Sequence, residues 1–423
     1  MERKSRAGKR SGSVVQGTVW AMVVAVTLAL TPGAGRAAKA PKEIPVGVVM
    51  PTTGLGAEWG RMGIKCINYV FDQVNASGGI KSLGGAKLKL YVADTKGTPE
   101  GAREEMEKMI VSRRPVAVFG SSASAQTLTS SIISDKYGIP QFTASQSDVI
   151  TKRGLKWIFQ IAPVTDLYSD TCINFYAYMV KKTGVKPRKA AIIGEDSAYG
   201  QSNINLFKKK VSTQGLQIVD VAAYHGGQRD FGPTISRWKA LGVDVVFAAM
   251  FASDGIQFTR DMKTLNFKPL AIIHSSGAPY TAEFLNNLKG TANNTLDAVV
   301  FSSGLGNKFP SVKKVIDGFI KKNGVPIDDY GASVLEGAGV FVDALETAKS
   351  TDPAKLRKAI LATKHSIGEK KFAIIPNGVQ FSPDGRNIAA MPLMMQILKE
   401  RQEVVFPESL QTAAPIWPFP GWN

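Results

Sequence analysis

The sequence has few of the residues that most enzyme active sites and metal sites need. Its 423 residues include only two cysteines, Cys66 and Cys172, and three histidines that stand far apart, His225, His274 and His365. There is no G-x-S-x-G nucleophile elbow, no H-E-x-x-H, no C-x-x-C and no phosphate loop ending in Gly-Lys-Ser/Thr. These absences argue against hydrolase, metal-dependent and nucleotide-dependent chemistry. We therefore predict a protein that is not an enzyme and that holds neither a metal nor a cofactor.

Long apolar runs are also scarce, and the one near the start of the chain is short. The uncharged stretch Val19–Leu30 follows a basic start, Met1–Arg10, and small residues continue to Ala40. A stop-transfer helix needs about 20 apolar residues, so a retained membrane anchor is the weaker alternative. A basic start, a short apolar core and a small-residue exit are typical of a secretory signal peptide. We predict that residues 1–40 are this signal peptide, cleaved after Ala37 or Ala40, and that the mature protein is periplasmic.

Acidic residues are outnumbered by basic ones, and the formal net charge is +18. The lysines and arginines are spread along the chain, with no dense run beyond Lys208–Lys210 and no nucleic-acid-binding motif. We therefore expect a solvated basic surface and no nucleic-acid partner. The two cysteines stand in predicted helices, where they either form a disulfide in an oxidising compartment or remain buried thiols.

The order of apolar patterns predicts the fold class. Ile44–Met50 is typical of a buried strand, and Glu58–Asn75 has apolar residues at three- and four-residue spacing, which indicates a helix. This alternation continues to Pro163 and then begins again. Two β-α-β-α runs predict an α/β fold of two Rossmann-like lobes with parallel sheets, joined by a hinge. We expect residues 41–163 and 303–380 in the first lobe, and residues 164–302 and 381–423, with an irregular tail, in the second.

Small hydroxyl residues follow two consecutive predicted strands. The sequence GSSASAQT at 120–127 follows the strand Val116–Phe119, and TASQS at 143–147 follows the strand at 140–142. Free backbone N–H groups and the helix dipole at such turns favour an anion, and serine hydroxyls can donate to a carboxylate. Ordinary helix capping is the alternative explanation for either cluster alone. Two clusters at adjacent strand ends favour a site for a small carboxylate.

These segments together resemble a known family. The opening VGVVMPTTGLGAEWGRMGIKCINYVFDQVNASGGI is followed by KLKLYVADTKGTPEGA, VFGSSASAQT, IPQFTASQSDVI and IIGEDSAYGQS. This order resembles the periplasmic solute-binding proteins of ABC importers, in the branch that includes the leucine/isoleucine/valine-binding proteins. The resemblance extends from about Ile44 to Leu398. It implies the type I periplasmic binding protein fold, and a monomer that closes on a small carboxylate or amino acid and delivers it to an inner-membrane permease.

The resemblance also implies roles for six residues. Ser124, Ser145 and Ser147 would hold the carboxylate and amine of the ligand from the first lobe. Trp59 stands where the family has an aromatic residue over the ligand. The aromatic residues that would close from the second lobe, with core packing as the alternative for each, are Tyr199 and Phe251.

One departure from the family pattern bears on the ligand. Amino-acid binders of the family often have an acid after the strand that here ends at His274, whereas this chain has Ser275, Ser276 and Gly277. A buried ammonium without a charged partner is costly. Either another acid, Asp254, replaces the missing one, or the ligand is an aromatic or aliphatic acid or amide without an ammonium, bound near Ser276.

Two other functions remain open at this stage. The same fold can act as a ligand sensor for a receptor, and nothing in the sequence excludes that role. A secreted serine hydrolase is the enzymatic alternative, and Ser124 would be its nucleophile.

Overall fold

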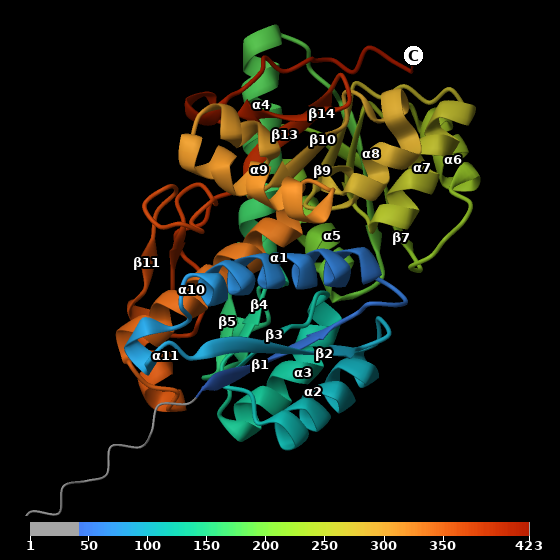
Figure 1. Cartoon of the computed structure of the whole chain (residues 1–423). Coiled ribbons are helices and arrows are strands. Elements are labelled where there is room, and N and C mark those ends of the chain that lie inside the picture. Colours follow the sequence, from blue (N-terminus) through green and yellow to red (C-terminus); the bar gives the residue numbers. More distant parts are fainter. Residues whose placement is uncertain (1–41, 423) are drawn as a thin grey trace, which may run out of the picture. The chain divides into compact units, whose positions relative to one another are not determined.

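Two sheets organise the chain in the computed structural model, which describes residues 42–422 (Figure 1). The predicted signal peptide lies outside the described residues. A five-stranded parallel sheet has the order β2-β1-β3-β4-β5, and a seven-stranded sheet has the order β14-β13-β10-β9-β8-β6-β7. In the second sheet β13 runs antiparallel to both of its neighbours, β10 and β14, and the other described pairs are parallel. A separate short hairpin is formed by β11 (Lys364–His365) and β12 (Val379–Gln380).

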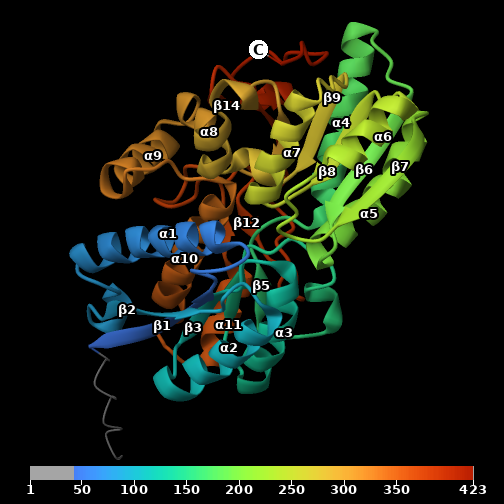
Figure 2. The same cartoon turned by 90° about the vertical axis from the view of Figure 1, so that its right-hand side faces the viewer.

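The first lobe contains the five-stranded sheet and its helices. Its strands are β1 (Glu43–Met50), β2 (Lys87–Asp94), β3 (Ala117–Gly120), β4 (Gln141–Thr143) and β5 (Ile158–Gln160). Its helices are α1 (Ala57–Ala76), α2 (Pro99–Arg113), α3 (Ser124–Tyr137), α10 (Asp329–Ala348) and α11 (Pro353–Ala362). Figures 1 and 2 show α1 and α10 on one face of the sheet and α2 and α3 on the other.

The alternation of side chains along β1 explains this layering. Val46 and Val48 belong to the buried cluster that includes apolar residues of α1 and α10. Val49 belongs to a separate cluster with Met106 of α2 and Ile133 of α3. Successive side chains of a strand point to opposite faces, so a strand buried on both faces must be apolar throughout.

The second lobe contains the seven-stranded sheet. Its strands are β6 (Lys189–Glu195), β7 (Gln217–Tyr224), β8 (Val245–Ala249), β9 (Ala271–Ser275), β10 (Leu296–Val299), β13 (Leu393–Leu398) and β14 (Arg401–Phe406). The helices are α4 (Thr165–Thr183), α5 (Ala198–Val211), α6 (Gly232–Leu241), α7 (Ala252–Thr264) and α8 (Ala282–Leu288), while α9 (Pro310–Asn323) packs against η6 and α1. Figure 2 shows β6, β7, β8 and β9 side by side.

This sheet is also covered on both faces. Phe247 of β8 packs in one cluster with Phe175 of α4 and Phe207 of α5. Val246, the preceding residue, packs in a different cluster with Trp238 of α6 and Phe258 of α7. Short 3-10 helices complete the described chain: η1 (Lys81–Leu83), η2 (Thr151–Arg153), η3 (Ser212–Gln214), η4 (Ala278–Tyr280), η5 (Lys289–Ala292), η6 (Ser303–Asn307) and η7 (Glu408–Leu410).

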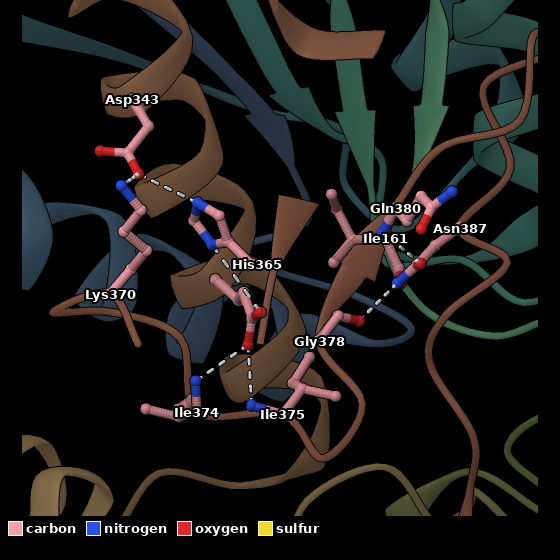
Figure 3. A network of polar contacts seen from close by, with 10 residues as sticks. Ile161, Asp343, His365, Lys370, Ile374, Ile375, Gly378, Gln380 and Asn387 are labelled. Carbon is pink, nitrogen blue, oxygen red and sulfur yellow. Dashed lines mark hydrogen bonds and ion pairs between the residues drawn. The ribbon is translucent and has the colours of Figure 1, made fainter. Parts of the chain in front are cut away.

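The chain leaves the first sheet after β5, and residues 381–392 lead from β12 to β13 of the second sheet. Asn387 ties these two passages together. Its side-chain Nδ2 donates to Ile161 O at 2.9 Å, just after β5, and to Gly378 O at 3.2 Å (Figure 3). Its Oδ1 accepts from the backbone N–H groups of Gln380 at 3.1 Å and Ala389 at 3.0 Å. Asn387 is 1% exposed, so these four bonds satisfy both ends of its amide away from water.

A buried carboxyl holds the loop that follows β11. Glu336 on α10 is fully buried, and its Oε2 accepts from the backbone N–H groups of Ile374 at 3.0 Å and Ile375 at 2.7 Å (Figure 3). His365 places Nδ1 3.9 Å from Oε1 of Glu336 and Nε2 3.1 Å from Oδ2 of Asp343. Burial raises the pKa of Glu336 to about 7, and the nearby His365 opposes part of that rise.

Glu336→Gln is expected to make stability less sensitive to pH. The folded-state pKa of Glu336 lies above its ordinary value of 4.5, so its contribution is full below pH 4.5 and declines as the pH rises through about 7. The decline corresponds to about 3 kcal/mol in the free energy of unfolding. Urea denaturation at pH 5 and pH 8 should show wild type losing more stability than the variant, while exposed Glu104→Gln should behave as wild type. Equal losses in Glu336→Gln and wild type would contradict this account.

Most predicted elements are confirmed, and the differences lie in short strands. The periodic pattern of the sequence does not predict β5, β11 or β14, and it predicts a strand at 298–302 where β10 covers Leu296–Val299. β5 has only three residues, too few for a periodic pattern to emerge. Within residues 42–422 both cysteines are free and buried, so the disulfide alternative is not formed. The predicted lobe boundaries remain a prediction.

The C-terminal segment is irregular from residue 411 onward, as expected from its proline content. Trp417 contacts the rings of Phe175 and Tyr176 in α4, with centroid separations of 6.1 and 6.3 Å. Trp422 donates its Nε1–H to Phe267 O at 2.8 Å. These contacts hold the tail on the second lobe. Across residues 42–422, no helix is long and apolar enough to span a bilayer.

Candidate ligand-binding site

A small pocket lies where strand ends and helix starts of both lobes meet. Its empty volume is about 290 Å³. The lining residues are Trp59, Ser122, Ala123, Ser124, Ala144, Ser145, Gln146, Tyr199, Ser276, Tyr280 and Tyr330. Within the described residues, none of these side chains is acidic or basic.

The serine wall is built at the carboxyl ends of β3 and β4. Ser124 is the first residue of α3, and its Oγ accepts from Ser147 N at 3.2 Å. The Oγ of Ser145 lies 3.0 Å from Ser122 O and 2.7 Å from Oγ1 of Thr127. Ser124 and Ser145 line the pocket, as the sequence analysis expected of ligand-binding residues. The Ser145 hydroxyl already donates to Ser122 O, so the donors that this neutral wall offers a ligand are the Ser124 hydroxyl and the backbone N–H groups at the start of α3.

Ser147 does not line the pocket. Its Oγ lies 3.3 Å from Oγ of Ser202 on α5, and its backbone N–H is the group that Ser124 accepts from. The structure therefore places Ser147 behind Ser124, at a contact between the two lobes, rather than at the pocket surface.

Aromatic rings form the remaining walls. The Trp59 ring lies 6.1 Å from the ring of Tyr330 and 4.9 Å from the ring of Phe251. Phe251 does not line the pocket, but it also packs against Tyr199 at 6.0 Å and so supports two rings that do. The indole Nε1 of Trp59 is buried without a hydrogen-bond partner among the described residues. Such walls suit a flat or apolar ligand body.

Two of the pocket aromatics, Trp59 and Tyr199, are each followed by a glycine. Each glycine allows the start of its helix to lie very close to the end of the preceding strand. A Cβ at Gly60 would lie 1.7 Å from Pro51 O, and one at Gly200 would lie 1.7 Å from Glu195 O. Only a residue without a side chain fits there. The aromatic-glycine pairs Trp59-Gly60 and Tyr199-Gly200 therefore position corresponding rings from α1 and α5, one from each lobe.

Ser276 is held in an unusual conformation at the far side of the pocket. Its φ of 47° is in the left-handed region, where residues other than glycine are uncommon. Its N–H donates to Ala298 O at 2.8 Å, and Tyr199 OH donates to Ser275 O at 2.9 Å. The Oγ of Ser276 donates to Oδ2 of Asp329 at 2.9 Å and accepts from Nε2 of Gln146 at 2.5 Å. Ser276 thus connects the two lobes directly.

Asp254 does not replace the acid that the family pattern leads one to expect. It is fully buried but does not line the pocket, and its Oδ1 accepts from Gly227 N at 3.0 Å. Burial raises the pKa of Asp254 above its usual value. Asp329 is separated from the pocket by Ser276, and burial raises its pKa to about 6. The pocket therefore offers an ammonium group no direct carboxylate partner within residues 42–422.

Several lining residues were missed by the sequence analysis: Ser122, Gln146, Tyr280 and Tyr330. Gln146 stands between the two predicted serines in TASQS. The prediction of a carboxylate site rested on hydroxyl groups and did not include this amide. The apolar pattern of this segment predicts a helix only from Ser333, whereas α10 begins at Asp329 and carries Tyr330 in its first turn. The Asp328 side chain caps α10 by accepting from Gly331 N, and this cap was the overlooked signal.

A neutral pocket between two parallel-sheet lobes is the architecture of a solute-binding protein. Residues 43–399 match the family model for the periplasmic binding proteins, and the chain belongs to that family. The family is one of solute-binding proteins rather than of enzymes. The chain is 26% identical over 382 residues to Leu/Ile/Val-binding protein homolog 7 of Brucella abortus (strain 2308), covering 88% of this chain and 94% of that protein.

Solved structures share the fold. The leucine-binding protein LivK of Thermotoga maritima has a TM-score of 0.73 at 18% identity, over 85% of this chain and 97% of that one. LivJ of Streptococcus pneumoniae, solved with isoleucine, has a TM-score of 0.76 at 18% identity, over 86% of this chain and 100% of that one. A solute-binding protein of R. palustris, solved with benzoate, has a TM-score of 0.74 at 16% identity, over 88% and 97%. These likenesses establish a type I periplasmic binding protein fold.

Proposed function

We propose that the chain is the periplasmic solute-binding component of an ABC importer, and that it binds a small carboxylate without an ammonium group. The observation that carries this proposal is the pocket lining. One wall consists of serine hydroxyls and backbone N–H groups at the start of a helix, the others are aromatic, and none is charged. Hydrogen-bond donors at a helix start favour an anionic head group. Stacked rings favour a flat or apolar body.

The absence of a lining acid argues against an ammonium group in the ligand. Removing a charged amine from water without a charged partner costs several kcal/mol. Asp329 accepts three hydrogen bonds, from Val300 N, Phe301 N and Ser276 Oγ, and so is already satisfied. The proposal thus follows the second of the two alternatives that the sequence left open.

Binding is proposed to stabilise the closed arrangement of the lobes. Ligand in the pocket would touch Ser124 and Trp59 from one lobe and Tyr199 from the other. Only the closed state makes both sets of contacts, so the ligand shifts the population toward it. An inner-membrane permease would then accept the closed, monomeric protein, which a cleaved signal peptide has delivered to the periplasm.

A thermal-shift screen tests this proposal. Mature protein, unfolded and refolded to remove any co-purified solute, is mixed with aliphatic and aromatic carboxylates, their amides, and the amino acids leucine, isoleucine and valine. At least one carboxylate without an ammonium should raise the melting temperature, with no product formed on long incubation. Turnover of any carboxylate, or no shift with any of these compounds, would contradict the proposal.

Branched-chain amino acids are the second candidate, since the curated relatives carry the name Leu/Ile/Val-binding protein homolog. The same screen separates the candidates, because leucine and 4-methylpentanoate differ chiefly by the ammonium group. A larger shift with leucine would favour this candidate over the proposed acid.

Ser124→Ala is expected to weaken binding of the best carboxylate by roughly tenfold to a hundredfold. A hydrogen bond to a charged group contributes about 1.5–3 kcal/mol, which corresponds to that range of dissociation constants. Isothermal titration calorimetry measures the change. Ser112→Ala, at an exposed position on α2, is the matched control and should bind as wild type does. Unchanged affinity in Ser124→Ala would remove Ser124 from the site.

A further inference from the structure

Three side chains form a hydrogen-bonded relay from one lobe to the other. Gln146 Nε2 lies 2.5 Å from Ser276 Oγ, and Ser276 Oγ lies 2.9 Å from Oδ2 of Asp329. Ser276 is 1% exposed and Asp329 is 2% exposed. The bond between Ser276 and Asp329 is therefore shielded from water, while Gln146 is partly buried. The directions of the two bonds follow from the donors and acceptors present.

Asp329 fixes the direction of the relay. Its Oδ1 accepts from Val300 N at 2.5 Å and from Phe301 N at 3.1 Å, as expected for a carboxylate. An ionised carboxylate can only accept, so the single hydroxyl proton of Ser276 must point to Oδ2. The Ser276 oxygen then has only acceptor capacity left for Gln146. The amide of Gln146 must turn its NH₂ toward Ser276, although side-chain amides are otherwise ambiguous in orientation.

With its NH₂ directed at Ser276, the Gln146 side chain can act only as a hydrogen-bond acceptor at its other end, through Oε1. Gln146 lines the pocket, and its Oε1 is buried without a hydrogen-bond partner among the described residues. A buried acceptor left unpaired is costly, so a ligand that supplies a donor should bind roughly tenfold more tightly than one that does not.

Resting on the proposed function, we infer that the solute of this pocket carries an uncharged hydrogen-bond donor, a hydroxyl or an amide N–H, which binds Oε1 of Gln146. The carboxylate of the same molecule occupies the serine wall. Ser276 and Asp329 act as positioning residues, because they orient the Gln146 amide without supplying the acceptor themselves. The ligand class is thus a small hydroxy acid or amide-bearing acid.

Two matched series of probes test this inference at pH 8, where Asp329 is ionised. The aliphatic series is 2-hydroxy-4-methylpentanoate, 4-methylpentanoate and leucine. The aromatic series is benzoate, the monohydroxybenzoates and the corresponding methoxybenzoates. In the wild type, at least one hydroxy acid should bind roughly tenfold more tightly than its unsubstituted or methoxy counterpart, as expected from one additional buried hydrogen bond.

The variant Ser276→Gly distinguishes the effect of the hydrogen-bonded relay on ligand preference from a general effect on closure of the lobes. Glycine accepts the left-handed φ of this position without strain, and the variant lacks the hydroxyl that orients Gln146. The amide can then turn its NH₂ toward the pocket. The preference for the hydroxy acid should fall to about threefold or less. The ratio of affinities is the readout, since a change in lobe closure alone would weaken both members of a pair equally. Ser112→Ala is the control.

The outcomes distinguish this inference from the proposed function. Tight binding of acids with equal affinity for hydroxy and methoxy forms would overturn the inference and leave the proposed function standing. A preference that survives intact in Ser276→Gly would also overturn it, as would leucine binding more tightly than every hydroxy acid. If no probe binds to either protein, the proposed function fails and the inference fails with it.

Discussion

Gly200→Ala is expected to lower the free energy of unfolding by about 3 kcal/mol or more and to abolish carboxylate binding. The added Cβ would lie 1.7 Å from Glu195 O and 2.7 Å from Glu195 N, which are backbone atoms at the end of β6. Backbone cannot move aside as a flexible side chain can. Relief therefore requires the start of α5 to shift, and Tyr199 shifts with it away from the pocket.

The measurement combines urea denaturation with calorimetric titration of the best carboxylate. Gly60→Ala should behave in the same way, because its Cβ would lie 1.7 Å from Pro51 O and would displace Trp59. Gly290→Ala is the matched control, since its Cβ would meet only Oε1 of Glu400 at 3.7 Å. If both Gly60→Ala and Gly200→Ala bind the carboxylate as wild type does, the close approach of each helix to the preceding strand does not position the rings of Trp59 and Tyr199.

Asn387→Ala is expected to destabilise the protein by about 3 kcal/mol. The truncation leaves two backbone carbonyls, of Ile161 and Gly378, and two backbone N–H groups, of Gln380 and Ala389, without the partner that now satisfies them. Because the site is 1% exposed, water does not readily replace the amide. Equilibrium denaturation should show a lower midpoint.

Asn387→Asp sharpens the test. The carboxylate keeps the acceptor for Gln380 and Ala389 but faces the carbonyls of Ile161 and Gly378 with an oxygen instead of NH₂. At pH 7 this variant should be at least as unstable as Asn387→Ala, since an unpaired buried charge costs about 3–5 kcal/mol. Exposed Asn287→Ala serves as the control and should be close to wild type. A stable Asn387→Asp protein would indicate that the passages are held by other contacts.

The fold was largely predictable because both sheets are buried on two faces. Continuous apolar strands such as Val245–Ala249, followed by amphipathic helices, leave strong periodic signals. The order of strands was less accessible. β13 and β14 join the second sheet from the far end of the chain, and the pairing of β13 with β10 depends on tertiary contact rather than on local pattern.

Residues that line the pocket can be predicted from the sequence where a pattern repeats locally, and not where their placement depends on residues far apart in the sequence. Serines at consecutive strand ends and aromatic-glycine pairs at helix starts are visible in the sequence. The acceptor role that we infer for Gln146 is not visible in the sequence. It depends on Asp329, 183 positions later on α10, because Asp329 orients Ser276 and Ser276 orients the Gln146 amide. Asp254 shows that a pattern in the sequence can also mislead. It was a candidate partner for a ligand ammonium, but its carboxylate accepts from Gly227 N and does not line the pocket.

The late arrival of β13 has a consequence for biogenesis. Until residues 393–398 have been synthesised, β10 has no neighbour on one side, and its Leu296–Val299 backbone is an open edge. Open apolar edges recruit strands from other molecules. A product ending before residue 393 should therefore be prone to aggregation or proteolysis, even though it contains every residue that lines the pocket.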